Sequence, residues 1–374
     1  MSGIYLHIPF CKQACHYCDF HFATSLKKKE PLLTAIAKEL ALRKAELEEE
    51  VQTIYFGGGT PSLLTAFEIE ALIDVIREHF VVTEFPEVTL EANPDDLSKD
   101  YLDSLADTSI TRLSIGVQSF FEEDLRWMNR AHNAREAMDA VVWAKERFEN
   151  LSLDLIYGIP GMSIERWEKN LAQVLELQVP HLSCYALTVE PRTALHRFIE
   201  KGVMPPVDDT LAQEHHRFLI KKMERAGYDN YEFSNFGKPG FYSENNMAYW
   251  HGESYLGVGP SAHSFDGERR SWNVANNAKY IQGIEAGELP LERETLSTRD
   301  RYNEYVMTRL RTMWGISLEE VQREFGTDYH SYLLEQANVH VGNELLEHTK
   351  SHLIVTPKGK FLSDGIASDL FRLR

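Results

Sequence analysis

Apolar runs and helical repeats of apolar residues alternate along the first half of the chain. Short apolar runs, which predict strands, occupy residues 3–8, 51–56, 88–90, 111–117, 151–157 and 181–187. Between them, apolar residues three and four positions apart predict helices near 31–47, 64–80, 98–106, 121–129, 133–148 and 163–177. This alternation indicates a parallel sheet with right-handed crossovers. Because a closed barrel needs more units than this, we predict an α/β fold with an open, partial (β/α)6 barrel.

The pattern changes twice in the second half of the chain. A helix at 211–226 and a short strand at 231–233 complete a first unit, residues 1–235. Residues 236–294 are rich in Gly, Asn, Ser and aromatic residues without clear periodicity, which predicts a loop-rich segment that carries function. In residues 295–374, helices at 298–313, 317–325 and 328–336 precede apolar stretches at 353–355 and 360–362. Helices followed by a short hairpin predict a smaller, mainly helical, winged-helix-like C-terminal domain.

The composition is that of an ordinary soluble globular protein, with 43% hydrophobic and 26% charged residues. Acidic residues outnumber basic ones by 57 to 39, a formal net charge of −18. Such a surface repels nucleic-acid phosphates, so we expect no nucleic-acid partner and interpret the C-terminal domain as a packing or docking module. No run reaches the length of a membrane span, and the N-terminus carries no export signal, so we expect a cytoplasmic protein.

Polar and glycine residues gather at or just after the end of each predicted strand. They are Cys11 to Cys18, Gly57 to Thr60, Glu91 and Asn93, Gln118 and Ser119, Asp154 with Tyr157 and Gly158, and residues 188–192. In α/β barrels the carboxyl ends of the strands converge on one face, where the active site is built. The sequence therefore predicts a functional site on that face.

Three of the four cysteines, Cys11, Cys15 and Cys18, lie within eight residues in the spacing C-x3-C-x2-C. Closely spaced thiolates on one loop select zinc or an iron–sulfur cluster. Three ligands leave one iron of a four-iron cluster open to a small molecule. The alternatives are a chance group of buried thiols, or a zinc site completed by one nearby histidine, His7, His16 or His21. The fourth cysteine, Cys184, stands alone on an apolar strand and is interpreted as a buried structural thiol.

Several segments resemble the radical S-adenosylmethionine (SAM) superfamily, whose cluster motif has this cysteine spacing. They are Ile4 to Phe20, Tyr55-Phe-Gly-Gly-Gly-Thr-Pro61, Glu91-Ala-Asn-Pro94, Ile115-Gly-Val-Gln-Ser119, Asp154-Leu-Ile-Tyr-Gly158 and Tyr249-Trp250. Within the superfamily, the chain resembles the branch of oxygen-independent coproporphyrinogen III oxidases and HemW-type haem chaperones. The last third of the chain matches this branch in layout only.

The resemblance implies that Cys11, Cys15 and Cys18 hold a [4Fe–4S] cluster whose open iron binds SAM. An electron from the cluster then cleaves SAM to a 5′-deoxyadenosyl radical. The resemblance also places SAM contacts at ten positions: Tyr5, Tyr17, Gly58, Gly59, Thr60, Glu91, Gln118, Arg130, Asp154 and Ala186. It further implies haem as a ligand, a haem-acceptor protein and a flavodoxin- or ferredoxin-type electron donor as partners. The resemblance does not decide whether the chain forms a homodimer.

Two functions compete within this branch. One is a haem chaperone that binds the cluster, SAM and haem and transfers haem to an acceptor; the other is the oxidase, which decarboxylates coproporphyrinogen III to protoporphyrinogen IX. Phe20 stands where the oxidases carry a further cysteine, and the cysteine loop begins at residue 11 without the oxidases' N-terminal extension, which favours the chaperone. The chaperones show H-N-x-x-Y-W where this chain has Asn245-Asn246-Met-Ala-Tyr249-Trp250. Because an amide is a poor ligand for haem iron, His251 and His263 are the nearby substitutes for Asn245. Whether the chain is also an enzyme stays open.

Overall fold

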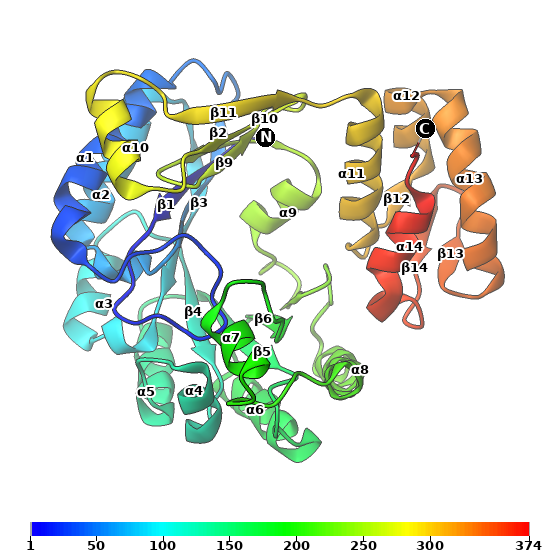
Figure 1. Ribbon diagram of the computed structural model, residues 1–374, viewed down its shortest axis with the longest axis horizontal. Helices are drawn as coiled ribbons and strands as arrows, with labels where there is room; N and C mark the ends of the chain where they lie inside the picture. The colour runs from blue at the N-terminus through cyan, green and yellow to red at the C-terminus, as the bar shows by residue number, and fades with distance from the viewer. Residues whose placement is uncertain (1, 374) are drawn as a thin grey trace.

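The computed structural model describes residues 2–373 and has an α/β fold with a large mixed sheet (Figure 1). Within these residues, eleven strands pair in the order β11-β10-β9-β8-β1-β2-β3-β4-β5-β6-β7. Six consecutive strands run parallel: β1 (Ser2–Ile8), β2 (Val51–Gly58), β3 (Val82–Ala92), β4 (Arg112–Gln118), β5 (Asn150–Tyr157) and β6 (His181–Ala186). The predicted open (β/α)6 arrangement is confirmed.

The parallel strands are buried on both faces, which is why they read as apolar runs and not as alternating patterns. Every residue of β4 is buried, for example. The crossover helices are α1 (Lys29–Leu42), α2 (Ala66–His79), α3 (Lys99–Ala106), α4 (Glu122–Met128), α5 (Ala134–Lys145) and α6 (Ile164–Leu177). Capping boxes at Thr65 and Asn133 fix the starts of α2 and α5. No helix within residues 2–373 is long and apolar enough to cross a membrane.

Both edges of the parallel sheet are extended by later parts of the chain. After α7 (Ala194–Glu200) and α8 (Asp209–Arg225), β7 (Asn235–Gly237) pairs antiparallel with β6, a few residues beyond the strand predicted at 231–233. On the other edge, β8 (Ser254–Val258) runs parallel to β1 on the side away from β2. The sheet then continues antiparallel through β9 (His263–Phe265), β10 (Arg269–Asn273) and β11 (Leu291–Thr295).

The expectation that residues 236–294 are rich in loops was therefore wrong. Besides its strands, this segment forms α9 (Glu244–Trp250) and α10 (Asn277–Glu285). Leu256, Tyr280 and Ile284 belong to the same hydrophobic core as the barrel. The pattern was hidden because the outer strands have only three to five residues and mix buried with exposed positions, so they show no clear periodicity.

The C-terminal domain has a hydrophobic core of its own, from Tyr302 to Leu370. It comprises α11 (Thr298–Leu310), β12 (Ile316–Ser317), α12 (Leu318–Phe325), α13 (Thr327–Gly342), β13 (Leu346–His348), β14 (His352–Val355) and α14 (Ser363–Leu370). The predicted hairpin exists, but β13 is the partner of β14, and Lys360–Leu362 forms a short 3-10 helix instead. Phe361 does not pair because its ring packs on His216 of α8. Figure 1 shows α11 as the helix of this domain that faces the barrel.

Candidate functional site

The cysteine loop, residues 11–18, is held by backbone hydrogen bonds to the rest of the barrel. At its base, its first N–H donates to Ala23 O (3.1 Å). In its middle, His16 N donates to Met128 O at the end of α4 (3.1 Å), and Leu195 N at the start of α7 donates to His16 O (2.7 Å). These bonds connect the loop to residue 23, to the end of α4 and to the start of α7.

The donor set of the loop fits an iron–sulfur cluster. Cys11, Cys15 and Cys18 are all half-buried, and burial raises the pKa of Cys18 to about 12 and raises that of Cys11. Arg130 places Nη1 3.3 Å from Cys15 Sγ, so a cation faces the thiols and favours a negatively charged thiolate cluster. Within residues 2–373, no three His, Cys, Asp or Glu side chains converge closely enough to hold one metal ion. A four-iron cluster binds each thiolate through a different iron and so accepts this wider spacing.

The end of β2 packs directly on the cysteine loop through Gly59. A Cβ on this residue would lie 2.7 Å from Phe10 O and 2.8 Å from Ile8 O. Both are backbone atoms, which cannot rotate away as a side chain could. The triple glycine that the sequence assigns to SAM therefore has a second task, because it lets β2 approach the base of the loop.

The predicted SAM contacts on β2 and β3 meet at the carboxyl group of Glu91. Tyr55 OH donates to Glu91 Oε1 (2.8 Å), and Gly58 N donates to Oε2 (3.2 Å). Burial raises the pKa of Glu91 to about 7, and burial likewise raises the pKa of Asp154 on β5 to about 6. Two desolvated carboxyl groups at one sheet end suit a cationic ligand, which would favour their ionised forms.

Arg130 connects the cysteine loop to the ends of β3 and β4. Its Nη2 donates to Asn93 Oδ1 (2.6 Å) and Gly116 O (2.9 Å), and its Nη1 donates to Tyr17 OH (3.5 Å). Asn93 Nδ2 in turn donates to Thr60 Oγ1 (3.1 Å). The Nε atom of Arg130 is buried without a protein partner, so one donor is left for a ligand.

The remaining predicted contacts lie at the same end of the sheet. Tyr5 stacks on Tyr55 with ring centroids 6.0 Å apart, Gln118 closes β4 in a left-handed conformation (φ 66°), and Ala186 is the last residue of β6. Eight of the ten predicted residues therefore lie on the parallel strands or directly after them, whereas Tyr17 lies in the cysteine loop and Arg130 follows α4. Their assignment to SAM stays a prediction.

Two residues of this face were not among the predicted contacts, Tyr55 and Asn93. Each hydrogen-bonds to a predicted contact, Tyr55 to Glu91 and Asn93 to both Thr60 and Arg130. Their positions in the sequence could have identified them, because both lie within a few residues of the strand ends at which the other polar residues gather.

A cavity of about 1110 Å³ opens between the sheet, α9 and α11 and reaches Asp19 and Phe20, just after the last cysteine. Its lining includes the aromatic residues Phe20, Tyr185, Tyr249, Trp250, Tyr255, Phe265 and Phe325, together with polar and acidic residues. A volume of this size slightly exceeds the range of about 300–1,000 Å³ that is usual for ligand pockets. The cavity therefore adjoins the cysteine loop and joins the barrel to the C-terminal domain.

Two of the four histidines that line the cavity are held by hydrogen bonds. His7 Nε2 donates to His21 O (3.0 Å), which leaves His7 Nδ1 to accept from Tyr5 OH (3.1 Å). His21 Nε2 donates to Asn277 Oδ1 (2.7 Å). Burial lowers the pKa of His7 to about 4, so this imidazole is neutral at physiological pH with both nitrogens occupied.

The other two histidines, His251 and His263, have free ring nitrogens. Their rings pack against Trp314 (5.2 Å between centroids) and Trp272 (6.1 Å) respectively. Within residues 2–373, no side-chain or backbone atom hydrogen-bonds to either ring. Burial lowers the pKa of both, which keeps them in the neutral form that a metal requires.

Asn245 lines the same cavity, but its side chain is occupied. Thr53 Oγ1 on β2 donates to Asn245 Oδ1 (3.3 Å). The backbone N–H groups of Glu244 (3.0 Å) and Asn245 (3.1 Å) donate to the carboxylate of Glu87 on β3. The start of α9 is therefore fixed to the interior of the barrel by a buried acid.

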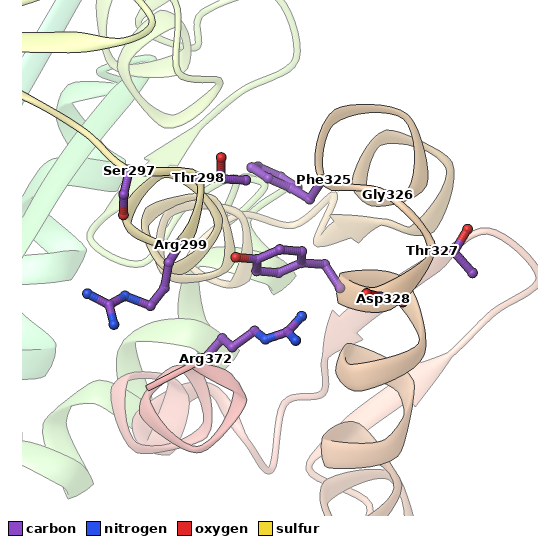
Figure 2. Close-up of a pocket in the computed structure, with 9 residues that line it drawn as sticks. Ser297, Thr298, Arg299, Phe325, Gly326, Thr327, Asp328 and Arg372 are labelled. Carbon is purple, nitrogen blue, oxygen red and sulfur yellow. The ribbon is translucent and has the colours of Figure 1, made fainter. Parts of the chain in front are cut away.

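A second cavity, of about 690 Å³, lies within the C-terminal domain (Figure 2). Arg299 on α11 and Arg372 near the end of the chain are among the residues that line it. The guanidinium of Arg372 lies 4.4 Å from the ring centroid of Tyr329. This cavity contains none of the residues that the sequence assigns to cofactors.

Comparisons with known proteins agree with this arrangement. The model of the Radical SAM superfamily matches residues 5–174, and that of the HemN C-terminal domain matches residues 296–362. "Heme chaperone HemW" of Lactococcus lactis is 32% identical over 366 residues, covering 98% of this chain and 96% of its own. The protein of the same name from Bacillus subtilis is 32% identical over 371 residues, covering 98% of each. This chain belongs to the HemW family.

Membership of the HemW family also places the chain in the radical SAM superfamily, which implies a [4Fe–4S] cluster and SAM. Among solved structures, coproporphyrinogen III oxidase (HemN) from Escherichia coli, described as a radical SAM enzyme, superposes with a TM-score of 0.86 at 24% identity. The match covers 100% of this chain and 90% of HemN. At that identity the likeness establishes the fold, which the HemW family shares with HemN.

Proposed function

We propose that this chain is a cytoplasmic haem chaperone, which holds haem in the cavity of about 1110 Å³ and passes it to an acceptor protein. The observation that carries the proposal is the make-up of this cavity. Flat aromatic side chains form part of its walls, and two imidazoles with free nitrogens line it. A porphyrin needs apolar contact for its faces and a nitrogen donor for its iron, and this cavity offers both.

Cys11, Cys15 and Cys18 hold the cluster in this proposal, and the ten residues at the strand ends hold SAM. Bound together, the two cofactors supply one-electron chemistry, for which a flavodoxin- or ferredoxin-type protein is the electron donor. The residues of the chain orient SAM. Glu91 and Asp154 face its cationic part, and the free Nε of Arg130 faces an anionic part.

The iron of haem binds to His263 or His251 and not to Asn245. The amide oxygen of Asn245 already accepts from Thr53, both ring nitrogens of His7 are engaged, and Nε2 of His21 is bonded to Asn277. His263 stands on β9 beside Trp272, and His251 follows the aromatic pair of α9. Either ring can bind iron without first breaking a hydrogen bond.

The chain is organised in three parts in this proposal: the barrel core at 1–235, the haem segment at 236–294 and the C-terminal domain at 295–374. The separate hydrophobic cores support a boundary near 295. The first two parts share one core, so they are expected to fold together.

Haem titration of the anaerobically reconstituted protein tests the proposal. Wild-type protein should give a saturable Soret shift that His263→Ala or His251→Ala weakens. His7→Ala is the matched control, because that ring lines the same cavity but both its nitrogens are hydrogen-bonded. Asn245→His should leave binding intact or tighten it. If neither free histidine matters, the iron ligand lies elsewhere. If the protein converts coproporphyrinogen III with SAM and a reductant, the oxidase alternative holds.

A further inference from the structure

The cavity contains one arginine whose charge has no partner. We propose that Arg301 binds a propionate carboxylate of haem, so that the C-terminal domain holds the polar edge of the porphyrin. This inference rests on the proposed function, and it adds the residue that recognises the charged part of the ligand.

Arg301 lies on the face of α11 that forms one wall of the cavity. Arg301, Tyr305 and Thr308 all line the cavity, and their spacing of four and three residues places them on one side of the helix. The arginine is half-buried at the N-terminal end of this face. Its guanidinium is therefore partly withdrawn from water, where a charge-assisted hydrogen bond is stronger than at a free surface.

The other arginines of the cavity are already neutralised. Arg270 pairs with Glu304 and lies 3.8 Å from Glu294, and Arg309 lies 3.0 Å from Glu320. Each of these guanidinium groups therefore has a carboxylate of the protein at hand.

Arg301 differs from them. Within residues 2–373, its side chain makes no ion pair or hydrogen bond. In a chain of net charge −18, acidic partners are abundant, so an unpaired arginine in a cavity is unusual. Its planar fork matches a carboxylate in bidentate geometry.

The chemistry of haem matches this distribution. Haem has an apolar ring system and two propionate groups that extend from one edge. The aromatic pair of α9 and the rings of the sheet cover apolar surface, whereas Arg301 provides the one unpaired arginine among the described lining residues. A porphyrin with its propionates toward α11 places its charged edge at the C-terminal domain and its apolar part against the barrel.

The test combines a protein variant with a ligand variant. Soret titrations compare haem with its dimethyl ester, which lacks both carboxylate charges, on wild-type protein and on Arg301→Ala. Haem should bind about tenfold more weakly to Arg301→Ala than to wild type. The ester should bind to both proteins about equally, because the interaction is absent in each case. Arg301→Lys should lose less than Arg301→Ala, since it keeps the charge but not the fork.

Arg299→Ala is the matched control. This arginine lies two positions away on α11 and lines the second cavity (Figure 2) and not the first, so its removal should not change haem affinity. Unchanged thermal unfolding of Arg301→Ala would show that the fold is kept. Equal haem affinity of Arg301→Ala and wild type would overturn this inference alone. If Arg301→Ala prefers haem over the ester as strongly as wild type does, this inference is also overturned. A wild-type protein without a saturable Soret shift would overturn the proposed function, and this inference with it.

Discussion

Replacing Glu91 by Gln should stabilise the cluster-free and SAM-free chain at pH 8 but hardly change its stability near pH 5. Burial raises the pKa of this carboxyl group from 4.5 to about 7, and Asp154 adds to the shift through charge repulsion. Below pH 4.5 the carboxyl group is neutral in both the folded and the unfolded chain. Between pH 4.5 and 7 only the unfolded chain loses the proton, so folding stability falls as pH rises. Gln resembles the neutral acid and escapes this loss.

The expected gain in folding stability follows from the size of the pKa shift of Glu91. One pKa unit corresponds to 1.36 kcal/mol, so the variant should gain under about 1 kcal/mol near pH 5 and about 3 kcal/mol at pH 8. The side chain is partly exposed, so screening by solvent makes this figure an upper estimate. Urea unfolding followed by circular dichroism at several pH values measures the difference. Glu84→Gln, an exposed position on the same strand, is the control and should show no such trend.

The same substitution should weaken SAM binding at pH 8, because a cationic ligand favours the ionised carboxylate that Gln cannot form. Calorimetric titration of the reconstituted protein should therefore show SAM affinity rising with pH in wild type and a flatter profile in the variant. A stability difference that does not change between pH 5 and 8 would refute the reasoning. So would a variant that is less stable than wild type at pH 8.

Three further predictions follow from the site. Replacing the three cysteines of the loop by Ala should abolish the iron of the reconstituted protein, about four atoms per chain, whereas Cys184→Ala should not; one bound zinc without labile sulfide would contradict this. Gly59→Ala should lower the free energy of unfolding by about 2 kcal/mol and reduce the iron content, because its Cβ would meet backbone atoms at the base of the loop. Gly342→Ala, whose Cβ meets open space, should have neither effect; thermal unfolding and iron analysis measure the difference. A chain truncated after residue 294 should stay soluble and keep its cluster but bind haem weakly, since α11 is gone; aggregation of this fragment would place the domain boundary elsewhere.

The parallel half of the fold could be predicted because its strands are buried on both faces and its helices have one apolar side. The outer sheet could not, since β11 is an exposed edge strand in which Glu292, Arg293 and Glu294 follow one another. The C-terminal hairpin was assigned to the wrong second strand for a related reason. Leu346 is the buried residue of β13, and one buried residue in three gives no alternation to detect.

The residues of the candidate site could likewise be predicted from the sequence only in part. The cysteines and the triple glycine could be found because their spacing is itself the signal. His251 and His263 were named from the sequence, but only the structure distinguishes their free ring nitrogens from the engaged ones of His7. The bonds of Asn93 to Thr60 and Arg130 join residues that are distant in sequence, so they could not be predicted. Asn245 illustrates this, because its bond to Thr53 joins residues 192 positions apart.

The hydrogen bonds that hold the cysteine loop have a consequence for the behaviour of the protein when it is exposed to oxygen. Oxygen destroys exposed iron–sulfur clusters, and many proteins collapse around the site they lose. Here the loop is fixed by backbone hydrogen bonds to Ala23, Met128 and Leu195, none of which involves a cysteine sulfur. We therefore expect a molecule without its cluster to keep the position of this loop and the shape of the adjoining cavity. If the proposed function holds, exposure to oxygen would then stop the radical chemistry of the protein without releasing haem into the cell.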